Sequence, residues 1–326
     1  MDGRSRMIPH DYAEGNFSIL SAKYGAGDRW VDATDVVKGK CRNPFLPFIV
    51  TYKEIPDPCW GTRKSLVVRY RWNGRELEGS VPEEEWACLA PEASDAYYAS
   101  LLSPMFAPIL SLPKRHSAEQ LAEAVARCGL SDYSDNYPRS LLGFVGKGLN
   151  IWQYPNQLAP YLLKAAEVAP RSYLEVGTRF GGTFAFTTEY LRFFGGLDRA
   201  VGIDMLESPF IRGYAAISPH VRFRRGNAHD SAILPADCQP FDLVMLDGSH
   251  DEDGVRLEFG MYSPGCKAVA IHDICDENFS NSVPDFWNSL KREKSGEFEF
   301  YEFVDQYPDV WQVGKKFLGI GLAIRK

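Results

Sequence analysis

Two aspartates that each end an apolar segment, and a histidine close to the first of them, are the residues best suited to do chemistry. Asp247 follows the apolar run FDLVML and begins the sequence D-G-S-H, which ends at His250. Asp273 follows the apolar run AVAI and His272. If the two runs are neighbouring parallel strands, their ends lie ~5 Å apart, and carboxylates that close need a proton or a cation between them. A divalent ion that prefers oxygen ligands, Mg²⁺ or Mn²⁺, is therefore expected at Asp247 and Asp273.

His250 is the candidate general base, because it lies three residues after Asp247 at the rim of the same pocket. An imidazole with an ordinary pKa of ~6.5 is mostly neutral at cellular pH and can accept a proton. His272 leaves two alternatives open. Adjacent strand residues face opposite sides of a sheet, so His272 either points away as a structural residue or ligates the metal, which would favour Mn²⁺ or another transition ion.

The segment RSYLEVGTRFGGT, residues 171–183, predicts a strand, a glycine-rich turn and a helix. Gly177, Gly181 and Gly182 allow a sharp turn and let a ligand lie against the main chain, and the following helix offers unpaired N–H groups to an anionic group. Glu175 would repel a pyrophosphate and hold an ammonium group. The spacing E-x-G-x-x-x-G-G also differs from the dinucleotide pattern G-x-G-x-x-G.

With these motifs in this order, the chain resembles class I S-adenosylmethionine-dependent methyltransferases. More narrowly, it is similar to the family-24 methyltransferases, which include cephalosporin-hydroxylase-like proteins and metal-dependent O-methyltransferases of macrolide sugars. The resemblance covers roughly residues 150–326. In the similar sugar enzymes, the aspartate of the D-G-S-H motif and acidic residues after the next strand hold a metal that chelates the substrate hydroxyls. This chain has His272 where some members have a second acid.

The resemblance implies S-adenosylmethionine as cofactor. Asp204, which ends AVGIDM, would accept hydrogen bonds from the ribose hydroxyls, and Asn227 with Ala228 would border the adenine ring; a helix-capping role is the alternative for both Asp204 and Asn227. The expected cofactor-binding residues are Gln153, Glu175, Gly177, Thr178, Gly181, Gly182, Thr183, Asp204, Asn227, Ala228 and Asp247.

The sequence from residue 150 onward alternates apolar strands with amphipathic helices, which predicts an α/β fold with a doubly wound, Rossmann-like, mostly parallel sheet. The last two segments, EFEFYEFV and LGIGLAIRK, have no helix between them and predict an antiparallel last strand, as in the methyltransferases. Asn156 is expected to cap a helix before the glycine-rich segment.

Four parts are predicted along the chain. Residues 1–16 read as a flexible arm, 17–90 as a small antiparallel β domain, 91–149 as a helical connector that acts as a lid or as a plain linker, and 150–326 as the methyltransferase domain. In the β domain, Asn73-Gly74 predicts a type I′ hairpin, and strands are also expected over 30–37 and 48–53. In the connector, Ser117 and Gln120 form a capping-box pattern, and Gly129 ends the helix.

Composition limits the partners. A net charge of −7 argues against a nucleic-acid partner, and no apolar run reaches the ~20 residues of a membrane helix. The seven cysteines are scattered, which favours reduced thiols and a cytoplasmic location, and the first residues show no signal-peptide core. The expected partner is a small-molecule hydroxyl acceptor, most naturally a sugar, and a homo-oligomer remains open.

We therefore predict an enzyme that transfers a methyl group from S-adenosylmethionine to a hydroxyl of a sugar or glycosylated natural product. The alternatives are an N- or C-methyltransferase of a small molecule and a non-catalytic protein that binds S-adenosylmethionine or serves as a scaffold. A nicotinamide-dependent enzyme is disfavoured by Glu175 and by the glycine spacing.

Overall fold

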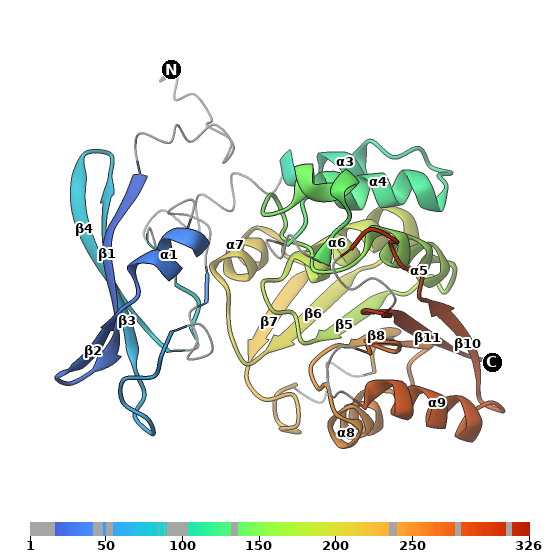
Figure 1. The fold of residues 1–326 in the computed structure, drawn as a ribbon. Helices are drawn as coiled ribbons and strands as arrows, with labels where there is room; N and C mark the ends of the chain where they lie inside the picture. Colours follow the sequence, from blue (N-terminus) through green and yellow to red (C-terminus); the bar gives the residue numbers. More distant parts are fainter. Residues whose placement is uncertain are drawn as a thin grey trace. The chain divides into compact units, whose positions relative to one another are not determined.

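The computed structural model describes residues 17–41, 48–49, 55–83, 85–87, 89, 104–131, 136–234, 240–277, 282–310 and 315–326. The chain forms two compact units (Figure 1), and the expected arm over 1–16 lies outside the described residues. The first unit comprises Met1–Leu101 and Ser208–Gly213, and the second comprises Leu102–Glu207 and Tyr214–Lys326.

The first unit contains a four-stranded antiparallel sheet in the order β2-β1-β3-β4. Its strands are β1 (Phe17–Ala26), β2 (Arg29–Asp32), β3 (Ser65–Trp72) and β4 (Arg75–Pro82). Asn73 and Gly74 join β3 to β4 with φ angles of 49° and 76°, and Trp72 pairs with Arg75. Positive φ at both central residues defines the type I′ turn, so the predicted hairpin is confirmed.

The expected strand over 30–37 is wrong in its second half. The strand β2 ends at Asp32, and a short helix, α1 (Thr34–Lys40), follows. The Asp32 carboxylate accepts a hydrogen bond from the Thr34 N–H at 2.8 Å, which turns the chain at this point. Of the expected strand over 48–53, residues 50–53 lie outside the described residues, and Phe48 makes an isolated bridge with Ala87.

The second unit is built on a seven-stranded sheet in the order β10-β11-β9-β8-β5-β6-β7. Neighbours from β9 to β7 are parallel, whereas β11 is antiparallel to both β9 and β10. The strands are β5 (Ser172–Val176), β6 (Arg199–Asp204), β7 (Val221–Arg225), β8 (Leu243–Leu246), β9 (Ala268–His272), β10 (Phe298–Phe303) and β11 (Ile320–Arg325). This confirms the predicted doubly wound, Rossmann-like sheet with an antiparallel last strand.

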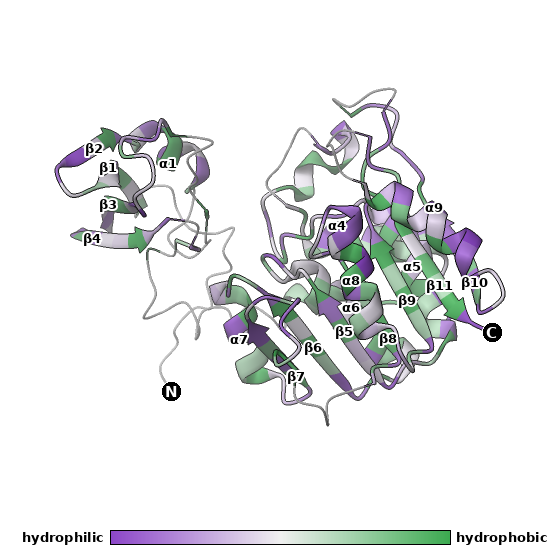
Figure 2. Cartoon of the chain, turned by 90° about the horizontal axis from the view of Figure 1, so that it is seen from below, coloured by the Kyte–Doolittle hydropathy of each residue, from purple (hydrophilic) through white to green (hydrophobic). Residues whose placement is uncertain are grey.

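Helices lie on both faces of this sheet (Figure 1). One face carries α4 (Ala118–Cys128), α5 (Pro155–Glu167) and α6 (Gly182–Tyr190), and the other carries α8 (Glu252–Tyr262) and α9 (Val283–Glu293). Because both faces are covered, every residue of β5, β8 and β9 is buried. Strands β8 and β9 are accordingly mostly hydrophobic in Figure 2, whereas β5 also contains Ser172 and Glu175.

The helix ends partly follow the predictions. Ser117 and Gln120 form the expected capping box at the start of α4, and Gly129 ends that helix with a φ of 106°. The expected cap at Asn156 is wrong, because α5 begins at Pro155 without a side-chain cap. The fixed φ of proline already suits the first helical position, and this places Asn156 inside the first turn.

No disulfide joins the five cysteines within the described ranges. Over the same ranges, none of the helices has the length and apolar run needed to cross a membrane.

Candidate active site

The carboxyl ends of β8 and β9 bring the predicted metal-binding aspartates together. The two strands are parallel neighbours, with Leu246 paired to Ile271, so the residues after them meet at one edge of the sheet. His272 connects the two carboxylates: its Nδ1 lies 3.0 Å from Asp247 Oδ1 and 2.9 Å from Asp273 Oδ1. The predicted proximity of Asp247 and Asp273 is therefore present in the fold.

His272 faces the carboxylates, so the alternative in which it points away is wrong. The side-chain alternation of β9 ends here, because Asp273 has a φ of 59° in the left-handed region. This turn lets two adjacent residues face one site. Burial alone would lower the pKa of His272, but the charges of Asp247 and Asp273 outweigh it and raise that pKa well above its ordinary value.

The contacts of His272 are short in distance but are not directed hydrogen bonds. Among the described residues, His272 Nδ1 and Asp273 Oδ1 are buried and have no hydrogen-bond partner. His272 is 8% exposed and Asp273 is 7% exposed, so water is largely kept from both. Buried polar atoms without partners are uncommon and costly, which makes this pair of atoms the most unusual feature of the site.

The other oxygen of Asp273 binds His250. Its Oδ2 lies 2.9 Å from His250 Nδ1 in a hydrogen bond, and this bond is the main reason that the pKa of His250 is raised. Burial would raise the pKa of Asp273, but the neighbouring His272 and His250 outweigh it and lower that pKa. The His250 side chain is otherwise exposed, so Asp273 orients an imidazole that faces solvent.

The residues present fit a divalent cation. Asp247, His250 and Asp273 each place one ligand atom within 4.8 Å of the others, and Asp273 Oδ1 makes no hydrogen bond within the described part of the chain. Two carboxylates and one imidazole, from either His250 or His272, form a donor set that divalent ions accept.

The glycine-rich turn lies at the carboxyl end of β5, next to Asp247. Gly177 and Gly181 have φ angles of 85° and 102°, which confirms that the turn needs glycine there. A Cβ on Gly177 would lie 2.1 Å from the Asp247 carbonyl oxygen, and a Cβ on Gly182 would lie 2.0 Å from that of Leu149. Two of the three glycines therefore also make room for the protein's own backbone.

Glu175 is not open at the mouth of the turn, as the sequence had suggested, but is only 2% exposed. It accepts a hydrogen bond from the Tyr173 hydroxyl. Burial raises the pKa of Glu175 to about 8, opposed by the Tyr173 hydrogen bond and assisted by the charge of Asp247. The Glu175 side chain is buried, like all five residues of β5, because helices cover both faces of the sheet.

Asp204 ends β6 and lies at the same edge of the sheet. Its Oδ2 accepts the Arg179 N–H at 2.5 Å, and its Oδ1 accepts the Leu206 N–H at 2.9 Å. These bonds tie the glycine-rich turn to β6. Burial raises the pKa of Asp204. Each carboxylate oxygen has a second lone pair, so both can still accept hydrogen bonds from a ligand.

Two further predicted cofactor-binding residues carry buried polar atoms. Gln153 Oε1 accepts the Tyr154 N–H at 2.9 Å, whereas Gln153 Nε2 and Thr178 Oγ1 have no hydrogen-bond partner among the residues described. Their chain neighbours pack together, since the Arg179 guanidinium lies 3.8 Å from the centre of the Trp152 ring. Buried polar atoms of this kind normally have a partner, which the described residues do not supply. Thr183, in the first turn of α6, is half-buried.

Asn227 and Ala228 follow β7 and shape a turn. Asn227 Oδ1 accepts the His229 N–H at 2.9 Å; no helix begins at this point among the described residues, so the helix-capping alternative is wrong. The Ala228 carbonyl accepts a hydrogen bond from the Tyr262 hydroxyl at 2.6 Å. The backbone of this segment is thereby fixed against α8.

Sequence reasoning missed a buried polar cluster beneath the D-G-S-H segment. Ser249 donates a hydrogen bond of 2.7 Å to Glu258 Oε1, and His229 Nε2 lies 3.1 Å from Ser249 Oγ and 3.3 Å from Glu258 Oε1. Glu258 is 1% exposed, and burial raises its pKa. The available signal was an acid on the apolar stripe of α8 between Val255 and Tyr262. This cluster holds the segment that carries Asp247 and His250.

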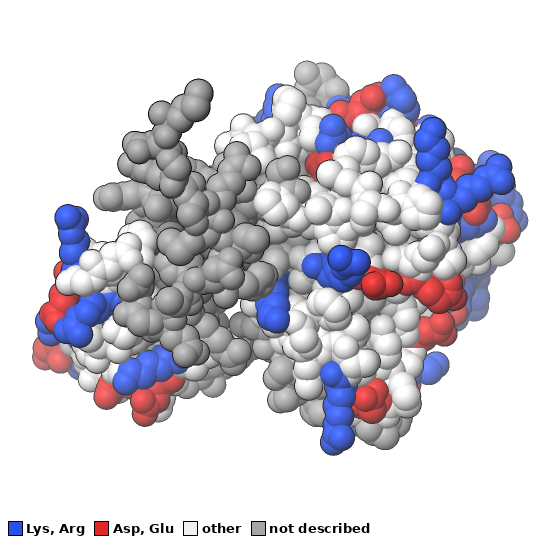
Figure 3. Space-filling model, turned by 90° about the horizontal axis from the view of Figure 1, so that it is seen from above, with Lys and Arg blue, Asp and Glu red and all other residues white. Residues whose placement is uncertain are grey.

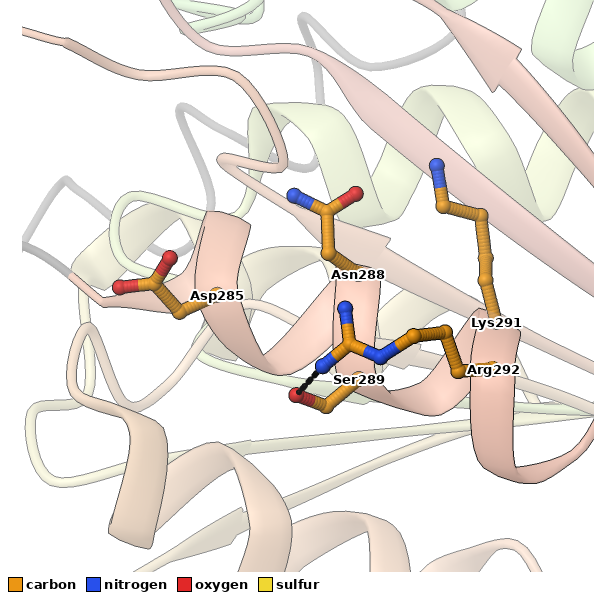
Figure 4. A pocket seen from close by; sticks show the side chains of 5 residues that line it. All are labelled: Asp285, Asn288, Ser289, Lys291 and Arg292. Atoms are coloured by element: carbon orange, nitrogen blue, oxygen red, sulfur yellow. Dashed lines mark hydrogen bonds between the residues drawn. The ribbon is translucent and has the colours of Figure 1, made fainter.

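A depression on the second unit lies elsewhere. It is lined by side chains of α9 alone, and Arg292 donates a hydrogen bond of 2.9 Å to Ser289 within it (Figure 4). The lining residues are Asp285, Asn288, Ser289, Lys291 and Arg292. None of the predicted site residues takes part.

No family model matches the chain, and no curated protein matches it. Among solved structures, it is similar to the O-methyltransferase TomG from Streptomyces achromogenes, in complex with S-adenosylmethionine, with 17% identity, 69% of this chain and 96% of the other covered, and a TM-score of 0.40. The O-methyltransferase from Bacillus cereus, in complex with S-adenosylhomocysteine, gives 14% identity, 71% and 100% coverage and a TM-score of 0.37. The methyltransferase PaMTH1 from Podospora anserina, also bound to S-adenosylhomocysteine, is 15% identical, with 54% of this chain and 80% of the other covered and a TM-score of 0.34. Because these TM-scores are below 0.5, the function proposed next depends on the strand order and on the side chains at the strand ends.

Proposed function

We propose that this protein transfers a methyl group from S-adenosylmethionine to a hydroxyl group of a small molecule, with a sugar or glycosylated natural product as the acceptor. One observation supports this most: the glycine-rich turn, Asp204 and the Asp247–Asp273–His250 cluster meet at the carboxyl ends of β5, β6, β8 and β9. Ligands of doubly wound sheets bind at this edge, where the strand order reverses. The resemblance in sequence to sugar O-methyltransferases supports the class of acceptor.

The cofactor would bind along the turn and the start of α6. The first N–H groups of α6 have no side-chain cap and are available to the carboxylate of the methionine part. Asp204 would accept hydrogen bonds from the ribose hydroxyls. Burial raises the pKa of Glu175. An ammonium group beside it would favour the ionised carboxylate through its opposite charge. S-adenosylmethionine supplies an electrophilic methyl group on a sulfonium.

His250 would take the proton from the acceptor hydroxyl. Its Nδ1 is held by Asp273 Oδ2, which leaves Nε2 to face the solvent-exposed side of the site. The hydrogen bond raises the pKa of His250 and makes the imidazole a stronger proton acceptor. An oriented carboxylate–imidazole pair of this kind fixes the tautomer that can accept the proton.

Asp247 and Asp273 would hold a divalent cation. A bound cation lowers the pKa of a hydroxyl that coordinates it. The charge of a metal would balance the two carboxylates, a role that His272 otherwise fills when it is protonated.

Binding and turnover measurements on the full chain test this proposal. S-adenosylhomocysteine should bind in calorimetry and NAD⁺ should not, and a library of hydroxyl compounds should yield products heavier by one methyl group. His250→Ala should lower turnover by ~10²–10⁴-fold while changing the affinity for S-adenosylhomocysteine by no more than a few-fold.

The matched control is His116→Ala. His116 is partly exposed and hydrogen-bonds the Pro113 carbonyl and the Tyr190 hydroxyl, away from the strand ends, so turnover should remain near that of the wild type. Binding of NAD⁺ in place of S-adenosylhomocysteine would overturn the proposal. Methylation of amines or carbons but of no hydroxyl would replace it with an N- or C-methyltransferase.

A further inference from the structure

We propose that His272 is the third protein ligand of the metal site, together with Asp247 and Asp273, and that this set prefers a first-row transition ion such as Mn²⁺ to Mg²⁺. The inference rests on the proposed function for the existence of a metal site. It adds which side chains complete that site and which class of ion it selects.

The spacing of the atoms supports a shared ion. His272 Nδ1 lies 3.0 Å from Asp247 Oδ1 and 2.9 Å from Asp273 Oδ1. Two ligand atoms that each lie ~2.1 Å from one ion, at right angles, are ~3.0 Å apart. The two distances therefore match adjacent corners of one coordination sphere.

Hydrogen bonding does not explain these distances. Within the described residues, His272 Nδ1 and Asp273 Oδ1 are both buried and neither has a hydrogen-bond partner, although they lie 2.9 Å apart. An N–H directed at the oxygen would have satisfied both atoms. An ion between them satisfies both without a proton.

The two oxygens of the Asp273 carboxylate contact different histidines, and this distinguishes the role of His272 from that of His250. Oδ2 of Asp273 is bonded to His250 Nδ1, so that nitrogen already has a partner, and the His250 ring is exposed. Oδ1 remains for the ion, on the side of His272. The positive φ of Asp273 is the backbone feature that presents its two oxygens to two different histidines.

The donor set determines the preferred ion. Mg²⁺ prefers oxygen ligands, whereas an imidazole nitrogen suits Fe²⁺, Ni²⁺ and Zn²⁺. Mn²⁺ also favours oxygen ligands, but as a first-row transition ion it accepts a nitrogen in a mixed set more readily than Mg²⁺ does. A glutamate at position 272 would restore an all-oxygen set and remove this preference.

Metal binding by the metal-stripped full chain tests the inference without measuring activity. Mn²⁺ titrated in electron paramagnetic resonance should bind more than about tenfold tighter than competing Mg²⁺, and pulsed spectra should show coupling to a bound ¹⁴N nucleus. In His272→Glu the nitrogen coupling should disappear, and the advantage of Mn²⁺ over Mg²⁺ should shrink below about threefold.

His250→Ala is the comparison variant, and it should retain both the nitrogen coupling and the Mn²⁺ affinity within a few-fold. Folding of each variant is checked by circular dichroism and S-adenosylhomocysteine binding. Loss of the nitrogen coupling in His250→Ala in place of His272→Glu would overturn the inference in favour of an Asp247–His250–Asp273 set. Equal binding of Mg²⁺ and Mn²⁺ without nitrogen coupling, or no metal binding, would also overturn it. If hydroxyl methylation persists in those cases, the proposed function stands without this site.

Discussion

The two carboxylate oxygens of Asp273 have different surroundings. Its Oδ2 is bonded to His250, while its Oδ1 lies against His272 without a hydrogen bond. The sequence indicated that Asp247 and Asp273 would be close, because both follow apolar strands. It did not reveal that the adjacent residues His272 and Asp273 would face one site, because that depends on the left-handed φ of Asp273, which an aspartate can adopt but does not require.

Glu175 makes the stability of the protein depend on pH. Its folded-state pKa of about 8 lies above its ordinary value of 4.5, so the folded state keeps a proton that the unfolded state loses. The stability it contributes is fully present below pH 4.5 and is lost as pH rises through 8. We expect Glu175→Gln to gain stability relative to the wild type between pH 5 and 8, by at most about 1.4 kcal/mol per pH unit, in urea unfolding.

Glu299→Gln serves as the control, since it changes an exposed glutamate of β10 by the same chemistry. Its unfolding free energy should follow that of the wild type across this range. Parallel pH profiles for Glu175→Gln and the wild type would show that Glu175 does not hold the proton.

At the scale of elements, the glycine-rich turn is fixed by the approach of β5 to β8. Gly177→Ala would place a methyl group 2.1 Å from the Asp247 carbonyl oxygen at a φ of 85°. Because backbone cannot move aside as a flexible side chain can, we expect a loss of about 2–5 kcal/mol in unfolding free energy. We also expect weaker binding of S-adenosylhomocysteine, since the turn and Asp247 would be pushed apart.

Gly296→Ala is the matched substitution, because a Cβ there would meet nothing within 4 Å. Chemical denaturation should show a change within about 1 kcal/mol for it. A Gly177→Ala protein as stable as the wild type would mean that the ends of β5 and β8 are not held so closely.

The elements themselves could be predicted where local chemistry decides. Alternating strands and helices, the Asn73-Gly74 hairpin and the Ser117 capping box are all present. Predictions failed where a neighbouring residue or tertiary packing decided instead. The helix α5 begins at Pro155, so Asn156 does not cap it, and the covering helices bury Glu175. The role of Glu258 in holding the D-G-S-H segment depends on the packing of α8 against that segment, which the sequence does not show.

For the whole molecule, charge sets the range of partners. The chain carries a net charge of −7, and on the face in Figure 3 the acidic and basic side chains of the described residues are interspersed. We expect fluorescence anisotropy to show no saturable binding of single-stranded or duplex nucleic acid up to ~100 µM protein at physiological salt, near the weak limit of non-specific binders. Binding that weakens steeply as salt is raised would contradict this expectation and reveal a local basic surface.

The position of β11 has a consequence for biosynthesis. β11 pairs with both β9 and β10, and Ile320 lies beside His272 in the register. While a ribosome is still translating the codons before residues 320–325, β9 has no partner on that edge and β10 has none from the rest of the sheet. The strand that carries His272 thus acquires this neighbour only after residues 320–325 have been made, and until then an exposed strand edge is open to unwanted pairing with other nascent chains.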